Sequence, residues 1–244
     1  MALPNRVLPG FSATLYAQSG ATPTVLDNTE LSTWADVNAI AIEGNIGAVK
    51  TTLAQLLSKH YQAKLVLEEF AENPFLTKFY ENPKQYAFPL ELFFLAERFK
   101  QQQEYIKRND LFQEPIISDY LFTKCLLFAK VNLPEEEYRL YQKMFDVFVT
   151  QLVTPDILIY LHAPVNKLQR NIKKRNRKFE QAIPDDYLFR IQETYTSYIK
   201  QHSIKTIYID ATNADFIYNE SHLKVITDAL DKDLEQGQHY FSLP

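Results

Sequence analysis

Cysteine is nearly absent from this chain of 244 residues, because Cys125 is the only one. A single cysteine excludes an intramolecular disulfide framework and a cysteine-rich zinc site. An excess of positive charge is also missing: 26 Lys and Arg residues stand against 30 Asp and Glu residues, which gives a formal net charge of −4. This balance disfavours a globally basic nucleic-acid-binding protein, although it leaves room for a local basic patch.

Long apolar runs are lacking as well. No stretch approaches the ~18 residues that a membrane-spanning helix requires, so we expect a cytoplasmic protein without membrane or nucleic-acid partners. Hydrophobic residues still make up 46% of the chain and aromatic residues 14%, which is enough for the core of one folded domain. Glycine is scarce, with 5 in the whole chain, so any cluster of glycines is informative.

Residues 1–37 differ in composition from the rest. They hold three of the twelve prolines and two of the five glycines, and Arg6 is their single basic residue. The charged start and the continuous apolar stretch of a signal peptide are missing, so a flexible N-terminal extension is favoured over a targeting sequence. Residues 38–244 are therefore predicted to form the functional domain.

From residue 38 onwards, short apolar runs alternate with helical patterns. The runs predict five strands, at 39–42, 65–67, 116–118, 157–161 and 206–209. The helical patterns cover 50–61, 84–108, about 120–130, about 134–152, 185–201 and 221–233. A further helix follows Asn73, and another begins at about residue 164 and runs into the basic stretch. Strands separated by helices predict an α/β fold, in which a five-stranded parallel sheet has helices on both faces. Ligands bind such sheets beyond the carboxyl ends of the strands.

The first predicted strand leads directly into a segment that resembles a P-loop, G-x-x-x-x-G-K-[ST]. Its predicted phosphate-binding residues are Gly44, Asn45, Ile46, Gly47, Ala48, Val49, Lys50, Thr51 and Thr52. Backbone N–H groups of such a loop surround phosphate oxygens, and the following helix N-terminus adds a favourable dipole. Lys50 is predicted to reach the β- and γ-phosphates of ATP, and Thr51 to bind Mg²⁺.

Val49 departs from this motif, because it stands where the second glycine is expected. A β-branched residue is strained at positive φ, by about 1–3 kcal/mol, and its side chain can crowd the phosphates. An ordinary glycine-containing turn before a helix is the simpler interpretation of the segment. The strand–loop–helix order favours a phosphate site, but full ATP binding stays open.

Acidic residues follow two other predicted strands. Glu68 and Glu69 come directly after the second strand, and Asp119 follows the third. An isolated acid at such a position usually caps the next helix. Because these strand ends converge on the P-loop, Glu68 is instead predicted to act as a general base or to help hold Mg²⁺.

The long helix at 84–108 carries Glu91 and Arg98 on one side, ~10 Å apart along its axis. Phe94 lies between them and Tyr86 precedes them. Charged groups beside an apolar face are costly unless they are paired. A polar seam that binds a base or sugar and a simple charge pair at the helix edge are equally consistent with this spacing.

The segment 167–178 concentrates positive charge in an otherwise acidic chain, with seven basic residues. A solvated helix face is the usual meaning of such a run, and no interleaved aromatic residues support nucleic-acid binding. The run follows the fourth strand and one helix, so it can form an arginine-rich lid over the phosphate site. Arginines placed there neutralise charge on a transferring phosphoryl group.

These segments together resemble the deoxynucleoside kinase family, most closely its bacterial deoxyadenosine/deoxyguanosine branch. The resemblance covers residues 38–232 and is carried by IEGNIGAVKTTLA, LEEFAENPFLTKFYENPKQYAFPLELFFLAERF, ISDYLFTKCLLFAKVNL, KKRNRKFEQAIPDDYL and YIDATNADF. It implies a P-loop kinase fold in a homodimer. It also implies transfer of the ATP γ-phosphoryl group to the 5′-hydroxyl of a deoxynucleoside, with purines preferred, in nucleotide salvage.

The resemblance also implies roles for individual residues. In the acceptor site, Glu68 matches the general base, and Tyr86 matches a contact to the sugar 3′-hydroxyl. Glu91 matches a base-reading position, and Arg98 and Asp119 match residues of the base pocket. Glu180 matches a lid carboxylate near the sugar. In the donor site, Arg175 and Arg177 match lid arginines, with Arg175 catalytic beside Lys50, and Asp215 and Phe216 match a loop on the donor base. Thr51 and Glu68 are the expected Mg²⁺ contacts.

Val49 is not the only departure of this sequence from the family pattern. Many members of the family carry an acidic-Arg-Ser triplet at the third strand, where this chain has Gln113-Glu114-Pro115. The arginine of that triplet therefore has no counterpart here. In the lid, Asn176 stands where glycine is common. Glu91 for glutamine leaves the base open, since a carboxylate only accepts hydrogen bonds. A catalytically weakened nucleotide-binding homologue is therefore the alternative function, and a nucleoside monophosphate kinase is a third.

Overall fold

A computed structural model describes residues 37–69, 73–109, 114–152 and 154–244. The predicted N-terminal extension therefore lies outside the described residues, apart from Val37, and remains a prediction. None of the helices in the described ranges is long and apolar enough to cross a membrane.

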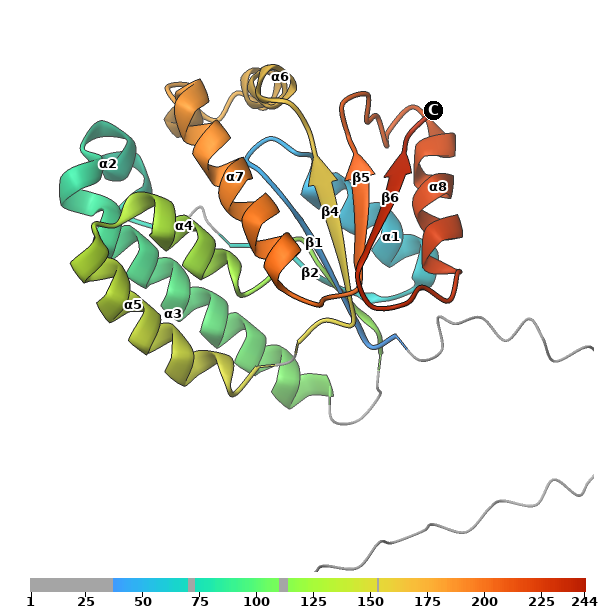
Figure 1. The fold of residues 1–244 in the computed structure, drawn as a ribbon, viewed down its shortest axis with the longest axis horizontal. Helices are drawn as coiled ribbons and strands as arrows, with labels where there is room; N and C mark the ends of the chain where they lie inside the picture. The colour runs from blue at the N-terminus through green and yellow to red at the C-terminus, as the bar shows by residue number, and fades with distance from the viewer. Residues whose placement is uncertain (1–36, 70–72, 110–113, 153) are drawn as a thin grey trace, which may run out of the picture. The chain divides into compact units, whose positions relative to one another are not determined.

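The strands form one parallel sheet in the order β2-β3-β1-β4-β5-β6 (Figure 1). Their bounds are β1 Ala39–Gly44, β2 Lys64–Val66, β3 Ile116–Ser118, β4 Ile157–His162, β5 Thr206–Asp210 and β6 Gln238–Ser242. The central strands β1 and β4 are buried along nearly their whole length, because a parallel sheet with helices on both faces has no solvent side. Their continuous apolar runs arise for this reason.

The prediction of five strands was correct for each of those five but missed β6. This edge strand reads Gln-His-Tyr-Phe-Ser and is only partly buried, with Tyr240 64% exposed. It pairs with β5 over five residues. Because an edge strand needs no continuous apolar run, nothing in its sequence separated it from a surface loop.

The helices match the predicted patterns closely, with α1 and α7 at the predicted bounds. They are α1 Lys50–Tyr61, α2 Leu76–Glu81, α3 Pro83–Asn109, α4 Lys124–Asn132, α5 Glu135–Val149, α6 Val165–Arg175, α7 Asp185–Gln201 and α8 Glu220–Leu230, with a short 3₁₀ turn η3 at Lys178–Glu180. Both α5 and α7 begin after a proline and carry acids in the first turn, where the helix dipole favours them.

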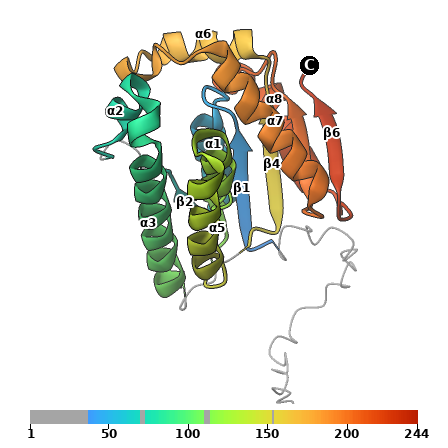
Figure 2. The same cartoon turned by 60° about the vertical axis from the view of Figure 1, so that its left-hand side comes forward.

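Helices α1 and α8 lie on one side of the sheet, and α4 and α7 on the other, with α3 and α5 packed outside α4. Helix α6 lies across the carboxyl ends of the strands (Figures 1 and 2). The segments that follow β1, β2, β3 and β4 therefore meet beneath α6. This edge is where the sequence placed the ligand site.

Candidate active site

The loop between β1 and α1 requires its two glycines. Gly44 has φ 152°, and a Cβ there would come 2.6 Å from the Leu161 carbonyl oxygen. Gly47 has φ 86°, and a Cβ there would come 2.8 Å from the Leu168 carbonyl oxygen. Val49 occupies left-handed backbone at φ 56° and ψ 26°, directly before α1. The loop thus adopts the turn that the motif predicts, with a valine at a position that favours glycine.

Side chains from distant elements hold this loop in place. Asn45 Nδ2 donates to the Leu188 carbonyl of α7 at 2.7 Å, and Asn171 Nδ2 of α6 donates to the Gly47 carbonyl at 2.8 Å. The buried carboxylate of Glu43 accepts from the Tyr195 hydroxyl of α7 and from a backbone N–H after β3, both at 2.7 Å. Burial raises the pKa of Glu43, although Lys124 and Lys50 lower it. The loop is thereby tied to both helices that carry the lid.

Lys50 folds back over its own loop. Its Nζ donates to the carbonyl oxygens of Gly44 at 2.9 Å and Asn45 at 3.0 Å. Burial and the nearby Lys124 ammonium lower the pKa of Lys50 to about 8, despite opposing attraction from Glu43, Glu68 and Asp119. The ammonium therefore stays mostly charged at neutral pH and can bind an anion.

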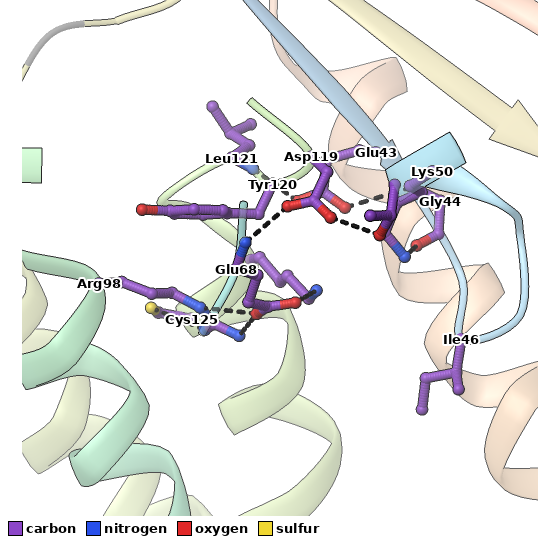
Figure 3. A network of polar contacts seen from close by, with 12 residues as sticks. Glu43, Gly44, Ile46, Lys50, Glu68, Arg98, Asp119, Tyr120, Leu121 and Cys125 are labelled. Atoms are coloured by element: carbon purple, nitrogen blue, oxygen red, sulfur yellow. Dashed lines mark hydrogen bonds and ion pairs between the residues drawn. The ribbon is translucent and has the colours of Figure 1, made fainter. Parts of the chain in front are cut away.

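Glu68 lies between two cations, of which Figure 3 labels Arg98. Its Oε1 accepts from Arg98 of α3, with Nε at 3.0 Å, and its Oε2 accepts from Lys124 of α4 at 2.6 Å. The Glu68 side chain is 15% exposed and those of both partners less than 10%. Burial alone would raise the pKa of Glu68. Lys124 and Arg98 lower this pKa by more than burial raises it, so the carboxyl is ionised at neutral pH.

Asp119 joins the loop to the two neighbouring strands. Its Oδ2 accepts from the Thr51 hydroxyl at 2.6 Å, and its Oδ1 accepts from the Glu68 backbone N–H at 2.7 Å. These contacts place Asp119 beside the phosphate loop. A hydroxyl and a carboxylate are hard oxygen ligands of the kind that Mg²⁺ binds while keeping several waters. No cluster of three His, Cys, Asp or Glu residues suited to a metal occurs in the part of the chain that the structure describes.

A first cavity opens beside Glu68. It is lined by Ile46, Lys50, Thr51, Glu68, Leu76, Phe79, Tyr80, Leu90, Glu91, Phe94, Arg98, Asp119, Lys124, Phe128, Asn132, Arg175, Arg177, Phe179, Glu180 and Tyr187. The predicted acceptor-site residues are all among these except Tyr86. The aromatic rings give the cavity walls suited to a flat ligand, and charged groups from the loop, α3 and the lid lie among them.

Tyr86, the predicted sugar contact, is not among the described residues that line this cavity. Its ring lies in the first turn of α3, with the Lys78 ammonium 5.7 Å from the ring centroid. Tyr80 lines the cavity in its place, with its ring stacked on Phe179 of the lid at 6.4 Å. The two tyrosines stand on either side of a turn, and residue spacing alone did not distinguish them.

Glu91 and Arg98 do not form the charge pair that their spacing allowed. Arg98 binds Glu68 and the Cys125 sulfur instead, with Nη1 to Sγ 3.1 Å. Glu91 Oε1 accepts from Asn132 Nδ2 at 2.6 Å. Burial raises the pKa of Glu91 to about 7, which outweighs the lowering by Asn132, Arg98 and Lys124. The seam of polar groups on α3 therefore faces the cavity.

The basic segment forms the predicted lid. Arg175 Nε donates to Glu180 Oε2 at 2.6 Å, and Arg177 donates to Glu180 Oε1 at 3.4 Å. Burial lowers the pKa of Arg175, and Glu180 opposes this. Asn176 ends α6 at φ 54°, a conformation that asparagine tolerates better than most residues, so the missing glycine leaves the lid turn intact.

A second cavity of about 710 Å³ lies on the other side of the loop. Its walls include Gly47–Thr52, the basic residues of α6 and the loop 212–218 that follows β5. Asp215 and Phe216, which the resemblance assigns to the donor site, both line it. Phe216 is only 5% exposed and its ring packs against His222, whereas Tyr218 is 83% exposed.

The two cavities share four residues, Lys50, Thr51, Arg175 and Arg177. A lysine-bearing loop, a carboxylate from the next strand and an arginine lid therefore surround one place, as the sequence predicted. Groups bound in the two cavities would therefore both lie beside these four residues.

Several residues of the site were missed from the sequence. Lys124 supplies the cation beside Glu68 that the triplet alignment had declared absent. Pro115 precedes β3, and its carbonyl accepts from the Lys64 N–H at the amino end of β2, so this triplet lies at the end of the strand opposite the cavity. Gln113 itself lies outside the described residues. The signal for Lys124 was its position five residues after Asp119, where it is the first residue of α4.

Comparisons with known proteins agree with this geometry. The sequence profile of the family "Deoxynucleoside kinase" matches residues 40–235. The chain is 35% identical over 196 residues to a deoxyguanosine kinase of Bacillus subtilis, which covers 77% of this chain and 93% of the relative. It is 35% identical over 166 residues to a deoxyadenosine kinase of Dictyostelium discoideum, which covers 67% of each chain.

Solved structures show the same fold. A deoxyadenosine kinase from M. mycoides, with the products dCMP and a flexible dCDP bound, superposes with a TM-score of 0.69 at 27% identity over 79% of this chain and 98% of that one. The same enzyme with bound dATP gives a TM-score of 0.68 at 25% identity, over 80% of this chain and 100% of that one. With a P-loop, a carboxylate and an arginine lid around one pair of cavities, this chain belongs to the deoxynucleoside kinase family.

Proposed function

We propose that this deoxynucleoside kinase transfers the γ-phosphoryl group of ATP to the 5′-hydroxyl of a purine deoxynucleoside. The observation that carries the proposal is the pair of cavities that share Lys50, Thr51, Arg175 and Arg177. A triphosphate in the larger cavity and a nucleoside in the smaller one meet at these residues. The purine preference is supported by relatives named as deoxyguanosine and deoxyadenosine kinases.

Glu68 acts as the general base in this proposal. It is ionised, it lines the acceptor cavity, and its two cationic partners, Arg98 and Lys124, hold it in one orientation. Both cations keep the carboxyl ionised, so that Glu68 is able to accept the proton of the 5′-hydroxyl as the phosphoryl group is transferred.

Thr51 and Asp119 are proposed to hold Mg²⁺, together with phosphate oxygens and water. Their hydroxyl and carboxylate already lie 2.6 Å apart. Both oxygens of Glu68 bind cations, which makes Asp119 the better second ligand than the predicted Glu68. When bound, Mg²⁺ neutralises charge that develops on the phosphate oxygens. Lys50, Arg175 and Arg177 would add positive charge from the loop and the lid.

A coupled assay tests the proposal with ATP and each of deoxyadenosine, deoxyguanosine, deoxycytidine and thymidine, over a range of Mg²⁺ concentrations. The proposal predicts phosphorylation of at least one purine nucleoside in preference to both pyrimidines. If none of the four is phosphorylated at any Mg²⁺ concentration, the proposal is wrong. Phosphorylation of nucleoside monophosphates alone would support the third function instead.

The weakened-homologue alternative was motivated by Val49 and by the Gln113-Glu114-Pro115 departure. The structure shows the loop closed around Val49, with the Ala48 N–H on the Asn45 carbonyl at 3.1 Å and the Leu53 N–H on the Val49 carbonyl at 3.3 Å. The valine therefore costs backbone strain without opening the turn. We propose that it lowers stability slightly and leaves phosphate binding in place.

Val49→Gly is expected to raise the free energy of unfolding by up to about 1 kcal/mol, because left-handed backbone strains valine more than the entropy of glycine costs. We expect kcat/KM for ATP to change by less than about threefold. Urea unfolding and initial rates measure the two effects, and Val49→Ala, which keeps a Cβ, is the control. A rate gain above about tenfold would instead support the alternative.

Tyr80 is proposed to take the sugar contact first assigned to Tyr86. Burial and the Glu180 carboxylate raise the pKa of Tyr80, so its hydroxyl remains a donor. Tyr80→Phe is expected to raise KM for the nucleoside about three- to tenfold, the usual worth of one neutral hydrogen bond. Tyr86→Phe is the matched control and should leave KM nearly unchanged. The opposite pattern in steady-state kinetics would restore Tyr86.

We further propose a homodimer. Leu140 and Val147, one above the other on α5, are 53% and 62% exposed, and a second copy would cover such apolar side chains. Sedimentation velocity measures the mass, and a monomer at micromolar concentration would contradict this proposal.

A further inference from the structure

One buried carboxylate oxygen in the first cavity has no partner. Glu91 is 1% exposed, and its Oε1 accepts from Asn132 Nδ2 at 2.6 Å. Its Oε2 is buried and makes no hydrogen bond with any of the described residues. A buried acceptor without a donor costs about 1–3 kcal/mol, so this position favours a ligand that supplies one.

The surroundings of Glu91 favour a flat aromatic ligand. Phe79, Phe94 and Phe128 line the same cavity as Glu91. Such rings pack well against a nucleobase but give it no hydrogen bonds. The identity of the base therefore depends on the few polar groups of the cavity, among which Glu91 has a free oxygen.

Arg98 does not neutralise Glu91, because its guanidinium is engaged by Glu68 and Cys125. The titratable and charged groups that influence Glu91 come from every neighbouring element. They are Arg98 of α3, Lys124 and Cys125 of α4, Tyr80 of α2, Tyr141 of α5, Tyr187 of α7 and Glu68. Asn132, the hydrogen-bonded neighbour, is neutral.

The two protonation states of Glu91 complement different bases. An ionised carboxylate offers two acceptors, which match the adjacent N1–H and N2–H₂ donors of guanine. A neutral carboxyl offers one donor and one acceptor, which match N1 and N6–H₂ of adenine. With the other base, each protonation state of Glu91 would leave a buried donor facing a donor, an acceptor facing an acceptor, or a polar atom unpaired. Buried mismatches of this kind discriminate strongly between two substrates.

We infer that Glu91 selects the purine: its ionised form accepts deoxyguanosine and its neutral form accepts deoxyadenosine, so that the preference follows pH. This inference rests on the proposed function and adds the substrate and its control. The pKa of Glu91, raised by burial to about 7, places the change of preference near neutral pH.

The test is the ratio of kcat/KM for deoxyguanosine to kcat/KM for deoxyadenosine, measured from about pH 5.5 to about pH 8.5. Titrations shared by both reactions, including that of Lys50, cancel in this ratio. The remaining factor is the ratio of ionised to neutral Glu91, so we expect about a tenfold rise per pH unit. The deoxyadenosine value alone should fall above about pH 7. A ratio that does not change with pH would overturn the inference.

Glu91→Gln provides the second arm. A glutamine keeps one donor and one acceptor at every pH, so the variant should favour deoxyadenosine throughout with a flat ratio. Glu97→Gln, on the same helix but absent from the residues that line the cavity, should keep the slope of the unchanged protein. If Glu91→Gln retains the slope, another group selects the base and the inference is wrong.

Calorimetric binding of both nucleosides separates this inference from the proposed function. A pH-dependent binding preference without turnover would support the role of Glu91 and refute the catalytic assignment. Turnover of both nucleosides at a pH-independent ratio would do the reverse. Failure of both nucleosides to bind or react would refute the two together.

Discussion

Glu68→Gln is expected to lower kcat by about 10²–10⁴, the usual contribution of a positioned general base. The amide keeps the shape of the side chain but cannot take the proton of the 5′-hydroxyl. We expect KM for the nucleoside to change little, because the aromatic walls and the polar seam of α3 are untouched. Single-turnover kinetics with saturating ATP would measure the chemical step directly.

The same substitution is expected to destabilise the protein, because Arg98 and Lys124 would be left buried beside a neutral group. Removing one partner of a buried ion pair costs about 3–5 kcal/mol. Urea unfolding measures this loss, and working well below the midpoint keeps the variant folded for kinetics. Glu69→Gln, at the exposed next residue, is the matched control and should change neither quantity. Full turnover by folded Glu68→Gln would show that another group is the base.

The fold was largely predictable because its central strands are buried on both faces. Continuous apolar runs such as Ile157–Leu161, separated by helical periods, lead to a parallel sheet and to ligand binding at its carboxyl edge. Edge strand β6 lacks this signal because burial does not constrain both of its faces. The P-loop glycines were predictable for another reason, since Gly44 and Gly47 each approach a backbone carbonyl too closely for a Cβ.

The pairing of side chains within the site was less predictable. Glu68, Arg98 and Lys124 lie on three different elements, and no sequence spacing links them. The sugar contact was also hard to assign from the sequence: Tyr80 lies near the end of α2 and Tyr86 near the start of α3, and the stacking of Tyr80 on Phe179 of the lid is visible only in the structure. Asp119 was placed correctly at the strand end, but its contacts with Thr51 became visible only in three dimensions.

Asp119→Asn is expected to lower kcat by about 10²–10³ and to raise the Mg²⁺ concentration needed for half-maximal rate about tenfold or more. The amide can still accept from the Thr51 hydroxyl, but it removes the negative charge that would hold the cation. Its NH₂ group would also face either the Glu68 N–H or the Thr51 hydroxyl, both of which are donors to Asp119. Initial rates over a Mg²⁺ titration at fixed nucleoside measure the shift.

The same titration decides between this role and the base-pocket role that the resemblance implied. A base contact at Asp119 predicts a higher KM for the nucleoside and an unchanged Mg²⁺ requirement. Thr51→Ser keeps the hydroxyl and should preserve the Mg²⁺ dependence, so it controls for a disturbed loop. Because Asp119 touches the P-loop on one side and the backbone of Glu68 on the other, a defect confined to nucleoside binding would contradict the metal assignment and return this residue to the base pocket.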